Sequence, residues 1–266
     1  MIKNKELNEL INKEWLITNG IGGYASSTIC GTNTRKYHGL LVAPLTPPAR
    51  RHLILSKVDE SITVNDKTYN LYTNMCENYI SDGYKYLVDF EKQYMPTFKF
   101  DVNGIKIEKT ICMKYRENTV CILYKIKNTK DKATLSLAPI VNFRDFHTVN
   151  SNHNFNIRQN VNNTKVKVVV DGISEHPIYM KCSVGEYVEH FNDNFTNMYY
   201  IEEEKRGFEP KENHAVTGVY NIRIASREEK YITFVCSLEE NIDEIDARKV
   251  INAEIKRLDK IIADTS

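Results

Sequence analysis

The sequence has no excess of charge of either sign and no long apolar segment. Its 266 residues include 36 lysines and arginines against 35 aspartates and glutamates, a formal net charge of +1 at pH 7. No apolar run approaches the roughly 20 residues that a membrane-spanning helix needs, and the first residues lack the apolar core of a secretory signal. These absences argue against nucleic acid and membrane as partners, and they predict a cytoplasmic protein.

The signatures of metal, nucleotide and serine-hydrolase sites are missing as well. The histidines form no HExxH or HxH pattern and the cysteines form no CxxC pair, so we expect no metal site. No GK[ST] loop, no GxSxG elbow and no strand–helix alternation is present, and we expect no cofactor. Six reduced and mostly buried thiols are predicted, because each lies in or beside an apolar segment: Cys30, Cys76, Cys112, Cys121, Cys182 and Cys236.

What the sequence does have, from about residue 15 to residue 236, is the period-2 alternation of β-strands. Phe98, Phe100 and Val102 alternate with polar residues, and the alternation resumes after Asn103-Gly104. Such a pair between two strands is a strong hairpin signal, because both residues tolerate positive φ. Further strands are expected at 38–43, 52–59, 61–65, 119–126, 132–141, 165–172, 218–225 and 230–237. We predict an all-β fold, a large antiparallel β-sandwich over residues 1–238.

Residues 239–266 change to a helical pattern. Apolar residues recur there at intervals of four, three and four, on one face of a helix: Ile251, Ile255, Leu258 and Ile262. Asn241 is expected to cap this amphipathic helix, with Glu244 three residues later.

The stretch "TNGIGGYASSTICGTNTRKYHGLL", residues 18–41, holds five of the eleven glycines. A phosphate cradle would need a helix after the glycines, but the residues that follow favour a strand. Gly20, Gly22 and Gly23 therefore predict a tight connection between two strands. That turn does not account for the polar and aromatic residues at 33–38. Planar polar side chains can bind vicinal sugar hydroxyls and aromatic rings can stack on sugar C–H faces, so this segment favours carbohydrate recognition.

Three separated segments resemble the N-terminal domain of bacterial and archaeal glycogen debranching enzymes of the amylo-α-1,6-glucosidase type. Residues 14–60 contain EWL-x-TNG-x-GG-Y-x-S, N-T-R-x-YHGLL, a Pro-Pro pair and Lys-x-(Asp/Glu)-Glu. Residues 138–147, "APIVNFRDFH", match the family's R-D-x-H strand, and residues 194–210 match its Y-x-x-E-x-x-RG segment. One segment departs from the family: "KENHAVTG" at 211–218 stands where an acidic ED-x-x-x-PG segment is usual.

The resemblance implies a super-sandwich domain joined by a helical linker to an (α/α)6 barrel that carries the catalytic carboxylates. The chain would end in that linker, at 239–266, and lack the barrel. The implied partners are α-glucan (glycogen or malto-oligosaccharide) and the barrel; we expect no independent activity, whereas the parent would hydrolyse α-1,6-glucosidic bonds. The residues expected at the glucan site or the domain interface, none of them catalytic, are Asn19, Gly22, Gly23, Tyr24, Asn33, Thr34, Arg35, Tyr37, His38, Arg144, Asp145 and His147.

Simpler interpretations stay open. The chain could be a structural domain that only buttresses the barrel, without glycan affinity. An exposed face of Trp15 or of a tyrosine beside planar polar groups would favour the glucan site, and an exposed apolar patch would favour the interface. Arg144 and Asp145 could form a local ion pair, and "IEEEKRG", 201–207, could be a solvated charged stretch.

Overall fold

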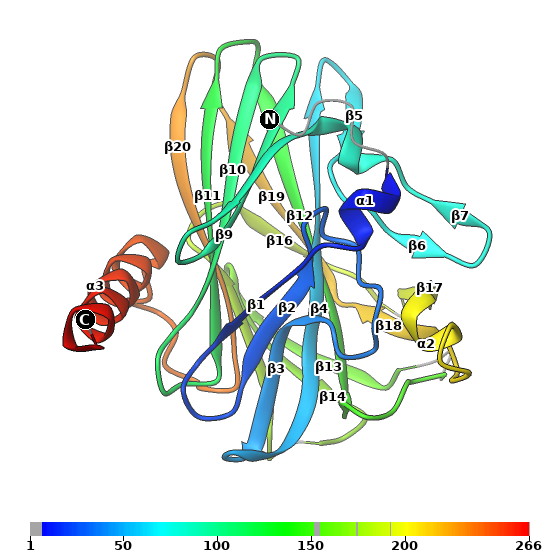
Figure 1. The fold of residues 1–266 in the computed structure, drawn as a ribbon. Helices are drawn as coiled ribbons and strands as arrows, with labels where there is room; N and C mark the ends of the chain where they lie inside the picture. The colour runs from blue at the N-terminus through cyan, green and yellow to red at the C-terminus, as the bar shows by residue number, and fades with distance from the viewer. Residues whose placement is uncertain (1–6, 152–154, 174, 192, 266) are drawn as a thin grey trace.

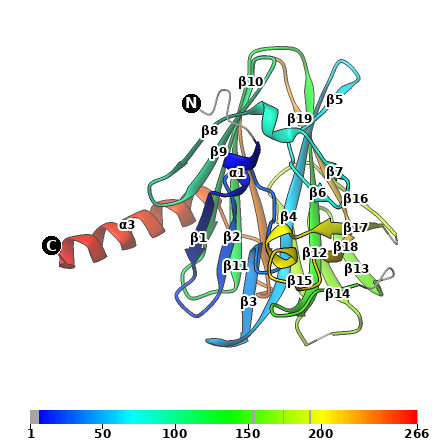
Figure 2. The ribbon, with the colours of Figure 1, turned by 45° about the vertical axis from the view of Figure 1, so that its right-hand side comes forward.

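The computed structural model describes residues 7–151, 155–173, 175–191 and 193–265. It confirms an all-β fold followed by a C-terminal helix: two antiparallel sheets pack face to face, and the helix lies beside them (Figure 1, Figure 2). In these residues sheet A contains twelve strands and sheet B contains eight.

Sheet A runs in the order β1 (Glu14–Thr18), β2 (Tyr24–Thr28), β3 (Gly39–Thr46), β4 (Ala49–Val64), β12 (Ala133–Asp145), β18 (Lys211–Val216), β17 (Asn194–Tyr199), β6 (Met75–Cys76) and β7 (Tyr79–Ile80). Strand β5 (Lys67–Asn70) pairs with β4, and β16 (Glu186–Glu189) pairs with β19 (Gly218–Ile224), which pairs with β12.

Sheet B runs in the order β13 (Ile157–Asn162), β14 (Lys165–Val170), β15 (Ile178–Cys182), β20 (Glu229–Ser237), β11 (Thr119–Asn128), β10 (Ile105–Met113), β9 (Pro96–Val102) and β8 (Leu87–Lys92). The helical segments are α1 (Leu7–Ile11), the 3₁₀ turn η1 (Gly83–Tyr86), α2 (Ile201–Glu204) and α3 (Ala247–Thr265).

The predicted hairpin at Asn103-Gly104 joins β9 to β10. Both turn residues have positive φ, 52° and 90°, and Val102 pairs with Ile105 directly across the turn. The alternation of β9 becomes an alternation of burial, in which Phe98 and Phe100 face the core. The sequence signal succeeds here because hairpin register depends on local residues alone.

Strand β4 corrects one expectation. The two strands predicted at 52–59 and 61–65 form one continuous strand of 16 residues. It pairs along nearly its whole length with β12, from Ala133 opposite Val64 to Asp145 opposite His52. Register shifts between Ile140 and Arg144 mark bulges in this ladder, and such bulges re-aim the side chains that follow them.

Charged side chains from the two sheets meet inside the sandwich core. Glu60 of β4 faces sheet B, where Lys109 Nζ lies 2.5 Å from its Oε1 and the Tyr124 hydroxyl donates to the same oxygen at 2.6 Å. All three side chains are buried. The two sheets are therefore joined by ionic and hydrogen-bonding contacts as well as by apolar packing.

Polar groups are also buried on the other face of sheet A. Lys57 and Asp59 alternate with Val58 and Glu60, so they point away from sheet B. Lys57 Nζ donates to the carbonyls of Thr73 and Gly31 at 3.1 and 3.3 Å and pairs with Asp59 at 3.2 Å. This face of sheet A is thus covered by the chain segments around Gly31 and Thr73, to which Lys57 is hydrogen-bonded.

Helix α3 follows the sandwich as predicted, but it begins at Ala247, and Asn241 is not its cap. Asp246 Oδ1 accepts a hydrogen bond from the Arg248 amide at 2.9 Å, which is the capping interaction. The preceding residues are not helical because Ile242 is buried in a small apolar cluster on sheet B. The domain boundary at residue 238 stays a prediction.

Most cysteine side chains are buried, as predicted. Five of the six are buried and Cys76 is half-buried. Burial raises the pKa of the Cys121 thiol to about 12, so it stays protonated and unreactive at neutral pH.

Candidate functional site: the segment at residues 33–38 and its supports

The glycine turn is a tight connection between β1 and β2, as predicted. Gly20 and Gly22 have φ values of 80° and 100°, and a Cβ on Gly22 would lie 2.7 Å from the carbonyl oxygen of Pro48. Asn19 Oδ1 accepts hydrogen bonds from the amides of Ile21 and Gly23 at 3.1 and 2.8 Å. Asn19 therefore shapes the turn with a side chain that is fully buried.

The first half of the segment is anchored inside the protein. Asn33 Nδ2 donates to the carbonyl of Ser56 at 3.2 Å, and Asn33 Oδ1 accepts from the Ser27 hydroxyl at 2.9 Å. The Thr34 amide donates to His38 Nδ1 at 3.1 Å. Asn33, Thr34 and His38 are all buried, so they shape the segment and do not reach its surface.

Arg35 and His38 share one carboxylate. Arg35 Nε lies 2.7 Å from Glu14 Oε1, and His38 Nε2 lies 3.6 Å from the same oxygen. The interaction with His38, followed by that with Arg35, holds the pKa of Glu14 at about 2, against the opposing effect of burial. Arg35 also lies 3.8 Å from Glu202, so its charge is balanced by two carboxylates.

Beneath the segment lies a buried polar cluster, which we call the Arg144 cluster: Asn142, Arg144, Tyr200, Glu212 and His214. Arg144 Nε and Nη2 donate to the two Glu212 oxygens at 2.6 and 2.8 Å. The alternative of a local ion pair between Arg144 and Asp145 is not what the structure shows, because the contact between them is a hydrogen bond from Arg144 Nη1 to the Asp145 backbone carbonyl at 3.2 Å. Bidentate pairing with Glu212 satisfies the guanidinium far better than an adjacent carboxylate could.

The charges in this cluster are tuned by their surroundings. Burial disfavours a charged Glu212, yet the Arg144 guanidinium holds the pKa of that carboxyl below its ordinary value. Burial lowers the pKa of His214 to about 4, so its ring is neutral near pH 7. His214 Nε2 lies 3.2 Å from the Tyr200 hydroxyl, which also donates to Glu212.

Three elements hold the backbone of the segment in place. Arg144 Nη2 of β12 donates to the Lys36 carbonyl at 2.7 Å, and the Tyr24 hydroxyl of β2 donates to the Tyr37 carbonyl at 2.7 Å. The Glu202 amide of α2 donates to the Thr34 carbonyl at 3.0 Å. These three hydrogen bonds to backbone carbonyls therefore fix the conformation of the segment.

The interpretation of residues 201–207 as a solvated stretch is wrong for one of its residues, Glu203. Glu203 is fully buried, and its Oε1 accepts a long hydrogen bond from the Lys36 amide at 3.4 Å. Its Oε2 lies 3.8 Å from both Lys36 Nζ and Arg206 Nη1. Charge composition predicted exposure, but α2 turns this carboxylate inward against the segment.

Four side chains on the outer side of the segment form what we call the aromatic surface: the half-buried Tyr37 and Phe146 and the exposed His147 and Phe208. The Tyr37 ring meets Phe146 edge-on at 5.6 Å between centroids, and its hydroxyl lies 3.3 Å from His147 Nδ1. Lys36 Nζ lies between Tyr37 and Phe208, at 5.4 and 4.9 Å from the two ring centroids. His147 is exposed, and Phe208 is 51% exposed.

The chain matches the family model of glycogen debranching enzyme N-terminal domains over residues 13–231. It belongs to this family. No curated protein matches the sequence.

Among solved structures, this debranching-enzyme domain is similar to a bacterial glucoamylase in complex with acarbose, with 10% identity and a TM-score of 0.45 over 93% of this chain and 35% of that one. It is similar to a protein described as a kojibiose phosphorylase from the human microbiome, with 10% identity and a TM-score of 0.36 over 93% and 28%. A polysaccharide lyase shows 10% identity and a TM-score of 0.38 over 83% and 30%. The chain thus spans about a third of the length of these proteins.

In this debranching-enzyme domain the predicted site residues fall into two groups. One group surrounds the segment and the end of β12: Tyr24, Asn33, Thr34, Arg35, Tyr37, His38, Arg144, Asp145 and His147. Asn19, Gly22 and Gly23 lie in the glycine turn, where the Gly22 carbonyl accepts a hydrogen bond at 2.6 Å from Arg51, the residue beside the Phe146 ring. Trp15 is buried against Phe98 and offers no exposed face.

The residues that the sequence analysis missed include Glu212, His214, Tyr200 and Phe208. Glu212 and His214 lie in the 211–218 segment that departs from the family pattern, and Tyr200 and Phe208 lie in the matching Y-x-x-E-x-x-RG segment. The available signal was a run of three polar residues at 212–214, which become buried in β18.

Within the described residues, no group of three histidine, cysteine or acidic side chains is placed to hold a metal ion. Among the described helices of this domain, none combines the length and apolar character needed to cross a bilayer.

Proposed function

We propose that this chain binds α-glucan at the aromatic surface, as the N-terminal domain of a cytoplasmic enzyme that acts on glycogen or a limit dextrin. The observation that carries the proposal is the arrangement of Tyr37. Its half-buried ring lies between Phe146 and Lys36, while its carbonyl is fixed by Tyr24. A ring that is held in place loses little conformational freedom when a sugar stacks on it.

Polar groups beside these rings support the same function. Asp145 Oδ1 accepts from the His147 amide at 2.8 Å, which fixes the loop that presents the imidazole. His147, Lys36 and Arg51 can each donate hydrogen bonds to sugar hydroxyls, and Arg51 lies 5.5 Å from the Phe146 ring. Aromatic rings and hydrogen-bond donors thus lie side by side within one surface.

Hydrolysis is assigned to a separate (α/α)6 domain. Three carboxylates of this chain, Asp59, Glu60 and Glu203, are buried and engaged with lysines. A substrate bond cannot approach these groups, so they are poor candidates for an acid and base pair.

Calorimetric titration of the 266-residue chain with a malto-oligosaccharide and with a branched limit dextrin tests the proposal, with free glucose assayed in parallel. We expect saturable binding without glucose release. Tyr37→Ala should weaken binding by about fivefold or more, the size of one lost aromatic contact. The matched control is Tyr231→Ala, because this exposed tyrosine lies on sheet B. Equal loss in both variants, or no saturable binding, contradicts the proposal.

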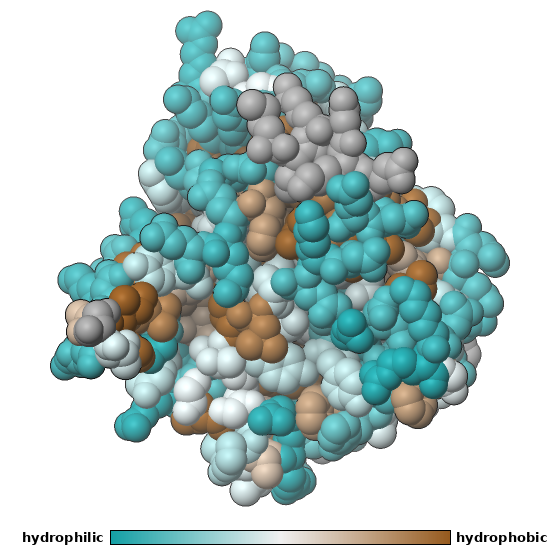
Figure 3. All heavy atoms as spheres, in the orientation of Figure 1, coloured by the Kyte–Doolittle hydropathy of each residue, from teal (hydrophilic) through white to brown (hydrophobic). Residues whose placement is uncertain are grey.

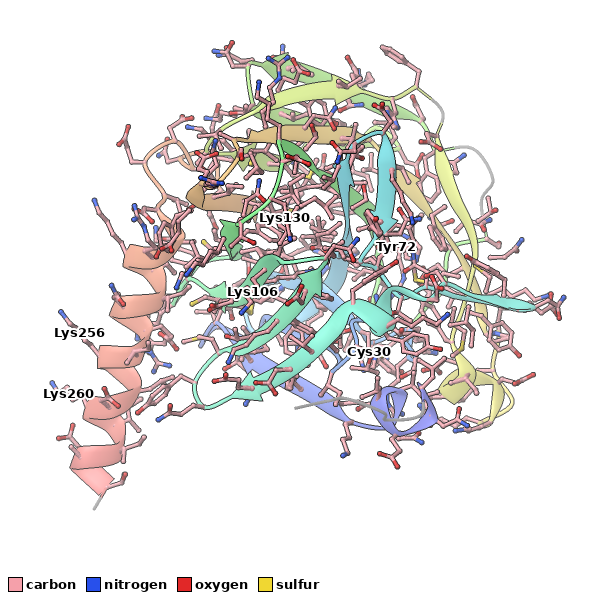
Figure 4. The ribbon with its side chains drawn as sticks, turned by 90° about the horizontal axis from the view of Figure 1, so that it is seen from above. Cys30, Tyr72, Lys106, Lys130, Lys256 and Lys260 are labelled. Carbon is pink, nitrogen blue, oxygen red and sulfur yellow. The ribbon has the colours of Figure 1, made fainter. Side chains whose placement is uncertain are left out.

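A second function, docking to the catalytic domain, is favoured by an apolar groove between α3 and β1. The groove has a volume of about 440 Å³ and is lined in part by Leu16, Met113, Leu258 and Ile262. Leu16 is 51% and Ile262 55% exposed. Hydrophobic residues are visible on α3 at the left of Figure 3, while Lys256 and Lys260 point away from the sheets (Figure 4).

Replacing Leu16 and Ile262 by lysine tests docking. Because both side chains are exposed, each change should alter the free energy of unfolding by no more than about 0.5 kcal/mol. In the enzyme that contains this domain, the double variant should lose the cooperative unfolding of the two domains in calorimetry. An unchanged single transition would show that this groove is not the interface.

A further inference from the structure

A groove at the far end of sheet A from the aromatic surface has the features of a ligand site. The aromatic surface adjoins Asp145, which pairs with His52, whereas the groove adjoins Val64 near the other end of β4. The β4–β5, β9–β10 and β11–β12 turns meet there and enclose about 350 Å³. That volume lies within the range of about 300–1,000 Å³ typical of small-molecule sites. Figure 4 looks onto this end and labels Lys130.

The groove has an apolar floor and a polar rim. Val64, Val102 and Ile105 form the floor together with the ring of Tyr69. The rim is made of side chains from all three turns: Asn65, Lys67, Asn103, Lys130 and Asp131. An apolar floor with a few convergent polar groups is the usual composition of a binding pocket, and an aromatic ring beside planar amides suits a sugar.

Two asparagines of the rim are held in place before any ligand binds. Asn65 Nδ2 donates to Asp131 Oδ2 at 3.0 Å, and Asn103 Nδ2 donates to the Tyr69 hydroxyl at 2.9 Å. Among the described residues, no hydrogen bond uses the side-chain oxygen of Asn65 or Asn103. These two acceptors are therefore held in place and available to sugar hydroxyls, so little ordering is needed on binding.

A second depression continues the groove and shares Asn65. It encloses about 780 Å³ and is bordered by Asp66, Arg223 and Glu228. Together the two depressions form one larger surface with planar polar groups in both parts. This extent fits several consecutive sugar units better than a single one.

We propose that the groove defined by Asn65, Tyr69, Asn103, Lys130 and Asp131 is a second binding site for α-glucan chains. The choice of α-glucan rests on the proposed function. Lys67 Nζ lies 5.1 Å from the Tyr69 ring centroid, and this exposed side chain moves aside when a sugar stacks on the ring. The two sites lie about 40 Å apart, the rise of the strand between His52 and Val64. A long glucan can therefore occupy both at once and bind more tightly than a short one.

Amide-resolved NMR of the full chain, titrated with maltoheptaose, tests this site. We expect saturable shifts in the side-chain amides of Asn65 and Asn103 and in the Gly104 backbone amide. Tyr69→Ala should weaken binding at these reporters by about fivefold or more, whereas Tyr69→Phe should retain most of it and Tyr231→Ala all of it. Thermal unfolding of each variant checks that the turns remain folded.

The outcomes separate this inference from the proposed function. Shifts confined to Tyr37 and His147 overturn the second site and leave the first intact. Shifts at Asn65 and Asn103 that Tyr69→Ala does not weaken overturn the assignment of the ring. Saturable shifts at the groove alone support this inference while they contradict glucan binding at the aromatic surface, and no shifts at either site contradict both.

Discussion

Arg144 illustrates how one buried side chain organises the candidate site. Its guanidinium donates to both oxygens of Glu212 and to the Lys36 carbonyl, so it couples β12, β18 and the 33–38 segment. A guanidinium suits this role because its planar donors point in several fixed directions. Truncating one partner would leave the other charge buried and unpaired, the most costly kind of change in such a pair.

His214 makes the stability of this cluster depend on pH. Its pKa is about 4 in the folded chain, because of burial, against an ordinary value of 6.5. Between these values the unfolded chain binds a proton that the folded chain does not, so stability falls as pH falls from about 6.5 to about 4. The loss from this residue should be on the order of 3 kcal/mol.

Urea unfolding at a series of pH values checks this prediction. His214→Gln should flatten the dependence of the free energy of unfolding between pH 6.5 and 4, whereas His147→Gln, a change at an exposed site, should leave the slope unchanged. A variant that is merely less stable, with an unaltered slope, would sink the assignment to His214.

The sequence could not predict this cluster, and the reason is its range. Arg144 and Glu212 are 68 residues apart, and their pairing depends on how β12 lies against β18. By contrast, the glycine turn is shaped within residues 19–23 and was predicted correctly. Asp145 is the carboxylate nearest to Arg144 in sequence. The β12 bulges, however, orient the Arg144 side chain toward Glu212 of β18 and not toward Asp145.

At the scale of elements, the segment from residue 239 to the end of α3 changes in character along its length. Ile242 is fully buried against Cys121 and Val235, whereas Ile262 near the other end is 55% exposed. The sequence showed the apolar stripe of the helix. It could not show that Ile242, before the helix, is packed more firmly than the last turn of the helix. Anchoring depends on the outer face of sheet B, which no local pattern describes.

Two matched substitutions test this difference. Ile242→Ala should lower the free energy of unfolding by about 2–4 kcal/mol, because it leaves a cavity in a packed cluster. Ile262→Ala should cost no more than about 0.5 kcal/mol in the same chain. Urea unfolding of the two variants measures both values, and similar losses would contradict the described difference in packing between Ile242 and the end of α3.

At the scale of the whole molecule, two large sheets are held in one arrangement partly by Glu60, Lys109 and Tyr124. The all-β class and the sandwich were predictable because alternation fixes which face of a strand is apolar. The crossing ion pair was not, because Glu60 and Lys109 look like ordinary surface residues in sequence. Apolar contacts are not directional, whereas a buried ion pair forms only when its two residues lie opposite each other.

A double-mutant cycle measures this link between the sheets. Lys109→Met should lower the free energy of unfolding by about 3–5 kcal/mol, since it strands a buried carboxylate. Adding Glu60→Gln should recover part of that loss, with a coupling of at least about 1 kcal/mol. Strict additivity of the two changes would mean that the pair does not act across the core.

The anchors of the 33–38 segment have a further consequence for how this surface can diversify. Tyr24 and Arg144 bind the carbonyls of Tyr37 and Lys36, and every amino acid has a carbonyl. The side chain at position 36, the variable position of the N-T-R-x-YHGLL pattern, can therefore be exchanged while the scaffold beneath it keeps its hold. Ligand preference depends on side-chain atoms at this position, whereas folding depends on the backbone carbonyl. Ligand preference can therefore evolve without loss of the fold.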